Sequence, residues 1–285
     1  MNVAVRTKQD TLEQHLRKLG RVAVAFSGGV DSTFLLKAAH VLLGNQVLAV
    51  TVNSHLSPKR ELDEAVLFTR NENIEHIIVE LDALTIPGFS HNPANRCYLC
   101  KTEFFSRIRH IAEKRGISHV AEGSNADDCN DYRPGLRAIE ELGIISPLRE
   151  AGLTRQEIQK LSGEKGLPTW NKPSFACLAS RIPYGEEITR QRLAMIDAAE
   201  QYLFDAGFRQ VRVRLHGSLA RIEMDEAGQQ RLSDKVLRQE IHCRFKEIGF
   251  VYVSVDLLGY RTGSMNEMLS SAEPQGQELS RTVPS

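Results

Sequence analysis

The sequence has no long apolar segment and no excess of charge of either sign. No apolar run approaches the roughly 18 residues that a membrane-spanning helix needs, and Arg6, Lys8 and Asp10 interrupt the N-terminus before a signal-peptide core can form. The 36 basic residues balance 36 acidic ones, so no overall field draws the chain to a nucleic acid or an anionic membrane. These absences predict a cytoplasmic protein without a membrane association.

Cysteine is also scarce. Five cysteines in 285 residues are too few, and odd in number, for a disulfide framework. Without an export signal they indicate a reducing compartment, where grouped cysteines serve metal or redox chemistry more often. The 41% hydrophobic and 25% charged residues are typical of a folded globular chain and exclude wholesale disorder, and the length favours about two domains.

Short apolar runs alternate with helical segments over the first part of the chain. We expect strands at 21–26, 47–52, 76–81 and 117–123, separated by helices at 10–19, 33–43, 61–71 and 101–115. Strands spaced by helices of about 10 to 15 residues are typical of βαβ units. Thr154 and Glu157 have the spacing of a capping box that opens another helix. The fold class is therefore α/β, a parallel sheet with helices on both faces.

The pattern changes after a connection rich in proline and glycine, residues 167–186. Beyond it we expect helices at 189–206 and 226–247, and strands at 208–215, 219–224 and 250–257. This order predicts a smaller α+β domain. We divide the chain into a first domain at 1–185, a second at 186–269, and a tail at 270–285 that lacks periodicity and is expected to be disordered.

A glycine-rich segment, Ser27-Gly28-Gly29-Val30-Asp31-Ser32, lies between the first expected strand and its helix, where an α/β sheet binds ligands. Its glycines let backbone N–H groups approach an anion, and the helix N-terminus adds positive partial charge. Ser27 and Ser32 can donate hydrogen bonds to phosphate, and Asp31 offers an oxygen suited to Mg²⁺. The segment lacks the Lys-Ser/Thr ending of a Walker A loop. A mere tight turn would explain the glycines but not the serines and aspartate.

This segment resembles the SGGxDS signature of the PP-loop ATP pyrophosphatases. The resemblance implies an adenine nucleotide alpha hydrolase-like fold and cleavage of ATP between its α and β phosphates. Members of this superfamily adenylate an oxygen of their substrate and release pyrophosphate. Because NAD and GMP synthetases, asparagine synthetases and tRNA thiolases share the signature, it does not choose among them.

A second polar group follows the fourth expected strand. Asp127, Asp128, Asp131 and Arg133 lie within seven residues of one another and could hold a metal ion and a phosphate together. An acidic loop with Asx-turn chemistry is an equally good interpretation of this stretch. We take Asp127, Asp128 and Arg133 as ATP-binding candidates beside the glycine-rich segment.

Five further stretches narrow the family: 131–135, 170–185, 211–214, 220–223 and 259–266. They resemble the LarE-type sulfur transferases, and the resemblance runs roughly from Leu12 to Leu269. It implies an enzyme that uses ATP and Mg²⁺ to insert sulfur into a pyridinium dicarboxylate mononucleotide, for the nickel-pincer cofactor of lactate racemase. It also implies sulfide or another sulfur donor, and assembly into a homo-oligomer.

Two cysteines, Cys97 and Cys100, lie at the start of an expected helix, whose dipole would favour thiolates together with Arg96 and Lys101. Cys177 lies far along the chain, in the 170–185 stretch. Three thiolates can hold a [4Fe–4S] cluster with one iron left for an added sulfide. Zinc with a fourth ligand such as a histidine, a Cys-x-x-Cys redox pair and buried inert thiols are the alternatives that the residues leave open.

The resemblance separates these alternatives. Some LarE-type members lack the Cys-x-x-Cys pair and sacrifice the sulfur of one cysteine in the 170–185 stretch. This chain has Cys97, Cys100 and Cys177, so it resembles the iron–sulfur branch, and the three thiols become the expected metal ligands. We assign Cys129 and Cys243 to the class of buried, inert thiols.

Arg212 and Arg214 are two residues apart on an expected strand and therefore share a face. Paired guanidinium groups bind a carboxylate or phosphate bidentately, although a solvated, charged strand face is the more usual reading. The resemblance assigns both arginines to the dianionic substrate. It adds four further substrate-binding residues: Ser180, Arg181, Glu200 and Glu223. By its position alone, Glu200 is equally well a surface residue of its helix.

The expected catalytic residues are Asp31, Lys101, Cys177 and Arg181. A substrate carboxylate would attack the α-phosphate, pyrophosphate would leave, and sulfide would displace AMP. Two other functions stay open on the sequence. A tRNA thiolase uses similar chemistry, although the balanced charge argues against a polyanionic partner. A zinc-stabilised nucleotide-binding module without catalysis is the second.

Overall fold

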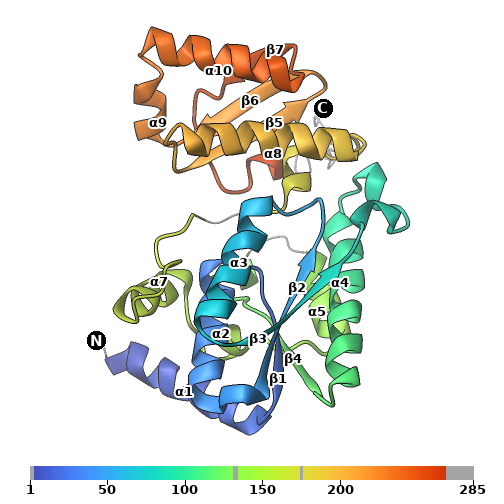
Figure 1. Cartoon of the computed structure of the whole chain (residues 1–285), viewed down its shortest axis with the longest axis vertical. Helices are drawn as coiled ribbons and strands as arrows, with labels where there is room; N and C mark the ends of the chain where they lie inside the picture. The colour runs from blue at the N-terminus through green and yellow to red at the C-terminus, as the bar shows by residue number, and fades with distance from the viewer. Residues whose placement is uncertain (1–2, 131–133, 174–175, 268–285) are drawn as a thin grey trace, which may run out of the picture.

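The computed structural model describes residues 3–130, 134–173 and 176–267, with the side chains of Cys129 and Asn130 left out. These residues form two lobes, drawn one above the other in Figure 1. The sheet of the large lobe has four strands and that of the small lobe has three.

The large lobe contains a parallel sheet in the order β3-β2-β1-β4. Its strands are β1 (Val22–Ala25), β2 (Val47–Asn53), β3 (Glu75–Glu80) and β4 (His119–Ala121). Its helices are α1 (Val3–Leu19), α2 (Val30–Leu43), α3 (Lys59–Asn71), α4 (Arg96–Lys114), α5 (Pro134–Glu141), α6 (Pro147–Glu150) and α7 (Arg155–Glu164). The capping box at Thr154 and Glu157 is present at the start of α7. The predicted α/β class is confirmed.

Helices cover both faces of this sheet, as the sequence predicted. Successive residues of a strand point to opposite faces. In β1, Val22 and Val24 pack into one apolar cluster with α1, α2, α3 and α7, whereas Ala23 packs into another with α4 and α5. The short apolar runs of the sequence are therefore strands that are buried on both sides.

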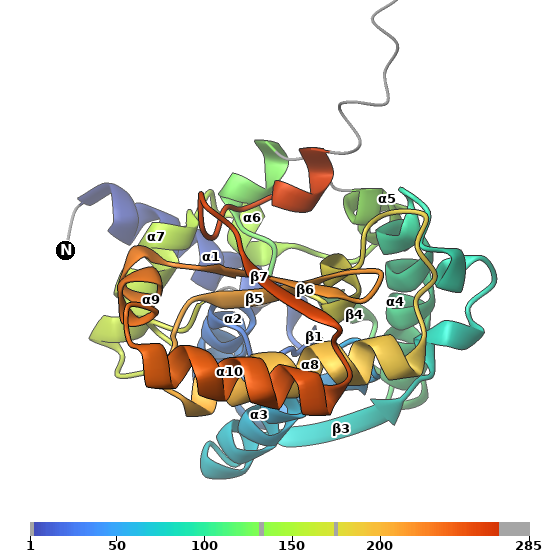
Figure 2. The same ribbon diagram turned by 90° about the horizontal axis from the view of Figure 1, so that it is seen from above.

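The small lobe has an α+β arrangement with sheet order β5-β6-β7. Its strands are β5 (Val211–His216), β6 (Leu219–Met224) and β7 (Tyr252–Val255), and its helices are α8 (Arg190–Asp205), α9 (Glu226–Arg231) and α10 (Lys235–Ile248). Helices α8 and α10 lie side by side along the sheet (Figure 2). The single helix expected over 226–247 is wrong: Asp234 caps α10 by accepting hydrogen bonds from the N–H groups of Val236 and Leu237, so a new helix starts there.

The core of the small lobe also takes residues from the first half of the chain. Leu56, Ala83, Ile86 and Phe89 belong to the same buried cluster as the apolar side chains of α8, β5 and α10. Packing is therefore continuous across residue 185, where the sequence pattern placed a domain boundary, and that boundary stays a prediction. The predicted tail at 270–285 lies outside the described residues.

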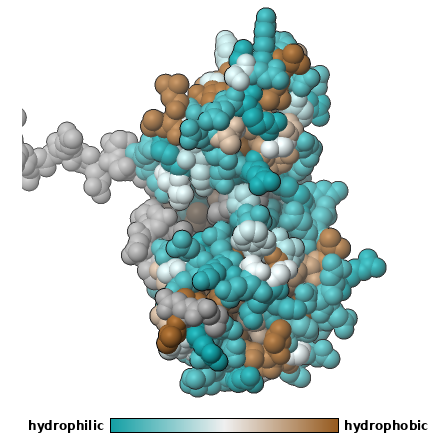
Figure 3. Space-filling view, turned by 90° about the vertical axis from the view of Figure 1, so that its left-hand side faces the viewer, coloured by the Kyte–Doolittle hydropathy of each residue, from teal (hydrophilic) through white to brown (hydrophobic). Residues whose placement is uncertain are grey.

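No helix in the described part of the chain is long and apolar enough to cross a membrane. The face seen in Figure 3 is largely hydrophilic, with apolar side chains in separate patches on both lobes. Leu257 and Leu258, which follow β7, are among the most exposed apolar side chains.

Candidate active site

A cavity of about 730 Å³ lies at the carboxyl ends of β1, β2 and β4 and extends to the small lobe. In the sheet order, β1 lies between β2 and β4, which is the kind of switch point where α/β sheets bind ligands. The predicted site residues that line the cavity are Ser27, Gly29, Asp31, Ser32, Cys97, Lys101, Asp128, Cys177, Ser180, Arg212 and Arg214.

The glycine-rich loop shapes the nucleotide end of this cavity. Gly29 is the N-cap of α2 and has no side chain to cap it, so the first N–H groups of the helix remain suited to an anion. The hydroxyls of Ser27 and Ser32 lie 3.1 Å apart at the same place. Gly28 has a positive φ of 73°, and a Cβ there would lie 3.2 Å from the carbonyl oxygen of Glu61. The loop therefore requires glycine at position 28.

Arg155, a residue that the sequence analysis missed, lies among the predicted ATP-site carboxylates. Its guanidinium forms an ion pair with Asp31, and its backbone N–H donates to Asp127 at 2.8 Å. Burial raises the pKa of Asp31 above its usual range, while Arg155 acts to lower it. The second oxygen of Asp31, Oδ1, is buried without a hydrogen-bond partner among the described residues. An oxygen of this kind fits Mg²⁺, which binds hard oxygen ligands.

The remaining residues that were predicted for the nucleotide end of the cavity are Lys101, Asp128, Asp131 and Arg133. The carboxylate of Asp128 accepts a hydrogen bond from the N–H of Asn125 at 3.0 Å. Asp131 and Arg133 lie outside the described residues. Lys101 reaches the cavity across Gly135, where a Cβ would lie 2.6 Å from Cδ of the lysine. Gly135 thus leaves the space that the side chain of Lys101 occupies.

The three predicted ligand cysteines converge on the cavity. Cys97 and Cys177 line it, and Cys100 lies close enough that the other two thiols act on its pKa. Burial raises the pKa of Cys100 above its ordinary value, and the nearby Cys177 and Cys97 raise it further. Cys177 is exposed on the cavity surface, yet loss of solvation around its thiol also raises its pKa. For Cys100 this loss of solvation opposes the thiolate stabilisation that we expected from the helix N-terminus.

The fit of an iron–sulfur cluster is mixed. In number and kind the thiols suit a [4Fe–4S] cluster held by three cysteines. Cys97 and Cys100 lie on α4, and Cys177 lies on the segment that follows residue 175. Within the described residues, however, no three His, Cys, Asp or Glu side chains are arranged as a metal-binding group.

The other two cysteines, Cys129 and Cys243, were expected to be buried and inert. Cys243 was expected to be buried, but its thiol is exposed on α10, where Gln239 contacts it at 3.4 Å. The prediction of a buried thiol is wrong because position 243 falls on the solvent side of the helix. The side chain of Cys129 lies outside the described part of the chain.

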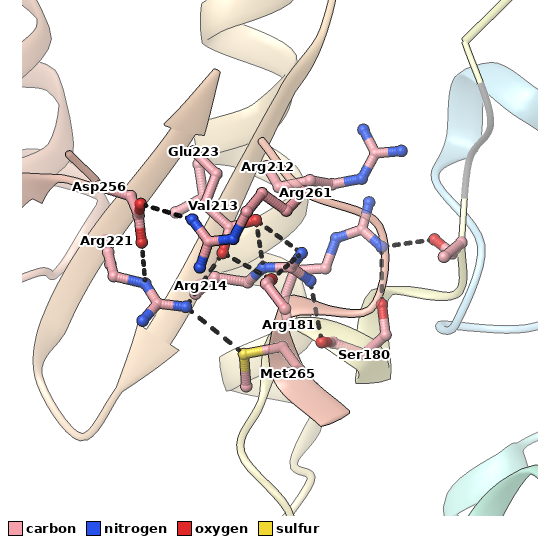
Figure 4. A network of polar contacts seen from close by, with 12 residues as sticks. Ser180, Arg181, Arg212, Val213, Arg214, Arg221, Glu223, Asp256, Arg261 and Met265 are labelled. Carbon is pink, nitrogen blue, oxygen red and sulfur yellow. Dashed lines mark hydrogen bonds and ion pairs between the residues drawn. The ribbon is translucent and has the colours of Figure 1, made fainter. Parts of the chain in front are cut away.

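Buried arginines form the other end of the cavity. Arg212 and Arg214 both line it from β5, and their residues are 1% and 5% exposed, which overturns the solvated-strand reading. Arg214 donates to Glu223 at 2.7 Å and to the carbonyl of Ser180 at 3.1 Å (Figure 4). Burial lowers the pKa of Arg212 to about 10, with nearby Arg181 acting in the same direction. Arg212 therefore remains cationic near neutral pH.

Arg181 and Glu200 lie behind this surface. Both are fully buried, so the reading of Glu200 as a surface residue is wrong. Arg181 pairs with both oxygens of Glu200 at 2.9 and 3.1 Å. It also donates to the backbone carbonyls of Ala176 and Cys177 at 2.6 and 3.1 Å. Arg181 therefore holds the backbone of Cys177 against α8.

Asn92 is a second residue that the sequence analysis missed. It has a positive φ of 55°, is fully buried, and donates to the carbonyls of Ile182 and Pro183 at 3.2 and 2.7 Å. Its side-chain oxygen accepts from the buried Arg96, whose guanidinium stacks on the ring of Tyr184. This contact joins the start of α4, with two of the cysteines, to the segment that follows Cys177. A lone asparagine in the sequence gave no sign of it.

Comparison with known proteins agrees with this geometry. The profile of a PP-loop domain matches residues 1–130. The parallel sheet and the glycine-rich loop at its switch point thus define a PP-loop protein that uses ATP.

Relatives that span nearly the whole chain narrow the assignment. The chain is 40% identical over 269 residues to the pyridinium-3,5-bisthiocarboxylic acid mononucleotide synthase of Lactiplantibacillus plantarum, covering 94% of this chain and 96% of that one. It is 40% identical to an uncharacterized protein of Synechocystis sp. over 93% of this chain and 99% of the other. An uncharacterized Methanocaldococcus jannaschii protein is 28% identical, over 90% and 97%. The chain belongs to the LarE-type ATP-dependent sulfur transferases.

Proposed function

We propose that this enzyme adenylates a carboxylate of a pyridinium-3,5-dicarboxylate mononucleotide and replaces the carboxylate oxygen with sulfur. The observation that carries the proposal is one cavity lined by the glycine-rich loop, by two of the three converging thiols, and by the buried Arg212 and Arg214. The printed name of the L. plantarum relative, a bisthiocarboxylic acid mononucleotide synthase, supports this class of product. Two rounds would yield a dithio product for nickel-pincer cofactor synthesis.

The nucleotide end prepares the electrophile. The N–H groups at the start of α2 would hold the phosphates of ATP, and Asp31 would offer an oxygen ligand to the accompanying Mg²⁺. An oxygen of the substrate carboxylate forms a bond to the α-phosphorus, and the bond from that phosphorus to the pyrophosphate oxygen breaks. Lys101 and Arg155 offset the charge that develops on the phosphates.

The small-lobe end holds the acceptor. Arg212 and Arg214 face the cavity and bind the dianionic dicarboxylate, since guanidinium groups pair with carboxylates in fixed geometry. Glu223 orients Arg214 by accepting its hydrogen bonds. Arg181 and Glu200 act one layer behind, as positioning residues for the backbone at Cys177.

The sulfur step takes place at the three thiols. Cys97, Cys100 and Cys177 would hold a [4Fe–4S] cluster that, when bound, supplies a sulfide on the iron without a protein ligand. Arg181 and Asn92 fix the two segments that bring these cysteines to the cavity. Displacement of AMP from the acyl-adenylate by sulfide then gives the thiocarboxylate.

Anaerobic purification with iron and labile-sulfide assays, followed by incubation with ATP and the dicarboxylate mononucleotide, tests this proposal. We expect iron and sulfide in the protein, AMP and pyrophosphate as products, and an acceptor mass that reports exchange of oxygen for sulfur. The absence of AMP and of sulfur transfer would overturn the function.

The source of the sulfur is tested separately. If Cys97→Ala or Cys100→Ala still gives multiple turnovers, or if the protein binds zinc without iron, the cluster role is wrong and adenylation stands. Loss of sulfur from Cys177 itself, detected by mass spectrometry, would assign the donor to that residue instead.

A further inference from the structure

Lys172 joins the glycine-rich loop to the first turns of α3 beside the cavity, which Glu61 of α3 lines. Its Nζ lies 3.2 Å from the carbonyl oxygen of Gly28, 2.8 Å from Oε2 of Glu61 and 2.5 Å from Oε2 of Glu64. The side chain is only 11% exposed. This buried clamp belongs to the same 170–185 stretch as Cys177, yet it contacts the nucleotide end.

The contact with Gly28 fixes the direction of a peptide group. In a trans peptide the C=O of Gly28 and the N–H of Gly29 point in opposite directions. Gly29 lines the cavity, whereas Gly28 and Lys172 are not among its lining residues. Because Lys172 binds the carbonyl of Gly28, we expect the N–H of Gly29 to point to the opposite side, toward the cavity that Gly29 lines.

The orientation of the Gly28–Gly29 peptide has to be fixed by a contact from outside the loop. Two consecutive glycines have no Cβ to restrict them, so the peptide between them can turn over more easily than a peptide between residues with side chains. In the turned-over state the carbonyl oxygen would face the phosphate and repel it. A cation bound to that carbonyl from outside stabilises the orientation that attracts an anion.

Glu61 holds the cation in place at a cost to stability. Its side chain is 9% exposed, and its second oxygen, Oε1, is buried without a hydrogen-bond partner among the described residues. An apolar residue usually serves packing as well as, or better than, a buried ion pair. A carboxylate at this position therefore points to a role beyond packing.

We propose that Lys172 is a positioning residue for nucleotide binding: it fixes the Gly28–Gly29 peptide so that its N–H group faces the phosphates of ATP. The inference rests on the proposed use of ATP. It assigns the 170–185 stretch a second task, since the segment that presents Cys177 also sets the phosphate-binding loop.

Two variants test the proposal by calorimetric titration with ATP and with inorganic pyrophosphate, which needs no sulfur transfer. We expect Lys172→Met to weaken both ligands by about tenfold, the usual effect of losing one charge-assisted hydrogen bond. Glu61→Gln combined with Glu64→Gln turns both ion pairs into weaker neutral contacts and should weaken binding by roughly threefold. Affinity for the dicarboxylate mononucleotide should not change.

The double variant distinguishes positioning from direct contact. If Lys172 bound the phosphates itself, removing the two negative charges beside it would tighten nucleotide binding, and that result would overturn the proposal. Unchanged binding in folded Lys172→Met would overturn it as well. Lys165→Met, at an exposed lysine earlier in the chain, is the matched charge control and should bind as the wild type. If the wild type binds neither ATP nor pyrophosphate, the use of ATP fails instead.

Discussion

The two ends of the cavity recognise anions by different means. At the nucleotide end, consecutive residues of one loop present backbone N–H groups and small side chains. At the substrate end, side chains from β5, β6 and α8 place buried guanidinium groups against buried carboxylates. Backbone dipoles bind an anion without a buried charge, whereas a buried arginine requires a carboxylate partner. The nucleotide end therefore depends on steric room around its loop, with ion pairs only beside that loop, whereas at the substrate end the anion-binding side chains are themselves charge-paired.

Breaking a buried pair should give the largest effect. Glu200→Gln leaves Arg181 buried without its carboxylate, and both side chains are fully buried. We expect a loss of about 3–5 kcal/mol in the free energy of unfolding, measured by urea denaturation. The exposed pair of Arg244 and Glu247 is the comparison, because Glu247→Gln should cost less than about 1 kcal/mol. Equal losses in the two variants would contradict the contrast.

Removing steric room at the nucleotide end should have the next largest effect. A Cβ at Gly123 would lie 2.9 Å from the backbone nitrogen and 3.1 Å from Cα of Ser32. Because backbone cannot move aside easily, Gly123→Ala should cost about 1–3 kcal/mol of stability and weaken ATP binding roughly tenfold. Gly163→Ala is the control: its Cβ would meet the ring of Trp170 at an ordinary 3.6 Å. A normal affinity for ATP in Gly123→Ala would show that the loop tolerates the displacement.

A milder version of the same test concerns Lys101. In Gly135→Ala the new methyl group meets flexible carbons of the lysine side chain. Lys101 can therefore turn away at a cost within roughly 1 kcal/mol of stability. The rate of AMP formation should fall about tenfold, since a displaced catalytic group loses its alignment. The alanine should have no further effect in a Lys101→Met background, and additive losses would contradict this explanation.

The smallest effect concerns Cys100, a thiol close to the same cavity. Cys100 is only partly exposed, and burial raises the pKa of its thiol, so its alkylation should be slow at neutral pH and should accelerate as the pH rises. Cys243 is exposed on α10 and should react first at pH 7. Site-resolved mass spectrometry after iodoacetamide treatment measures both rates. Labelling of Cys100 at pH 7 as fast as Cys243 would contradict the burial argument.

Sequence patterns predicted what depends on neighbours in the chain. The strands of the parallel sheet and the glycine-rich loop follow from local periodicity and spacing. The break between α9 and α10 did not, because the cap at Asp234 outweighed a continuous helical pattern. Arg155 and Lys172 were missed because their partners, Asp31 and Gly28, lie 124 and 144 positions away. The spacing of Arg212 and Arg214 predicted that they share one face of a strand, but only the fold shows that both residues are buried.

The shared core of the small lobe has a consequence for how the protein is made. Leu56, Ala83, Ile86 and Phe89 are synthesised early, yet the partners that bury them come from α8 through α10. On the ribosome, these four apolar residues must wait for the last third of the polypeptide to emerge. A nascent chain that stalls or is truncated after the glycine-rich loop has formed would display them to solvent. We expect such fragments to be captured by chaperones or to aggregate.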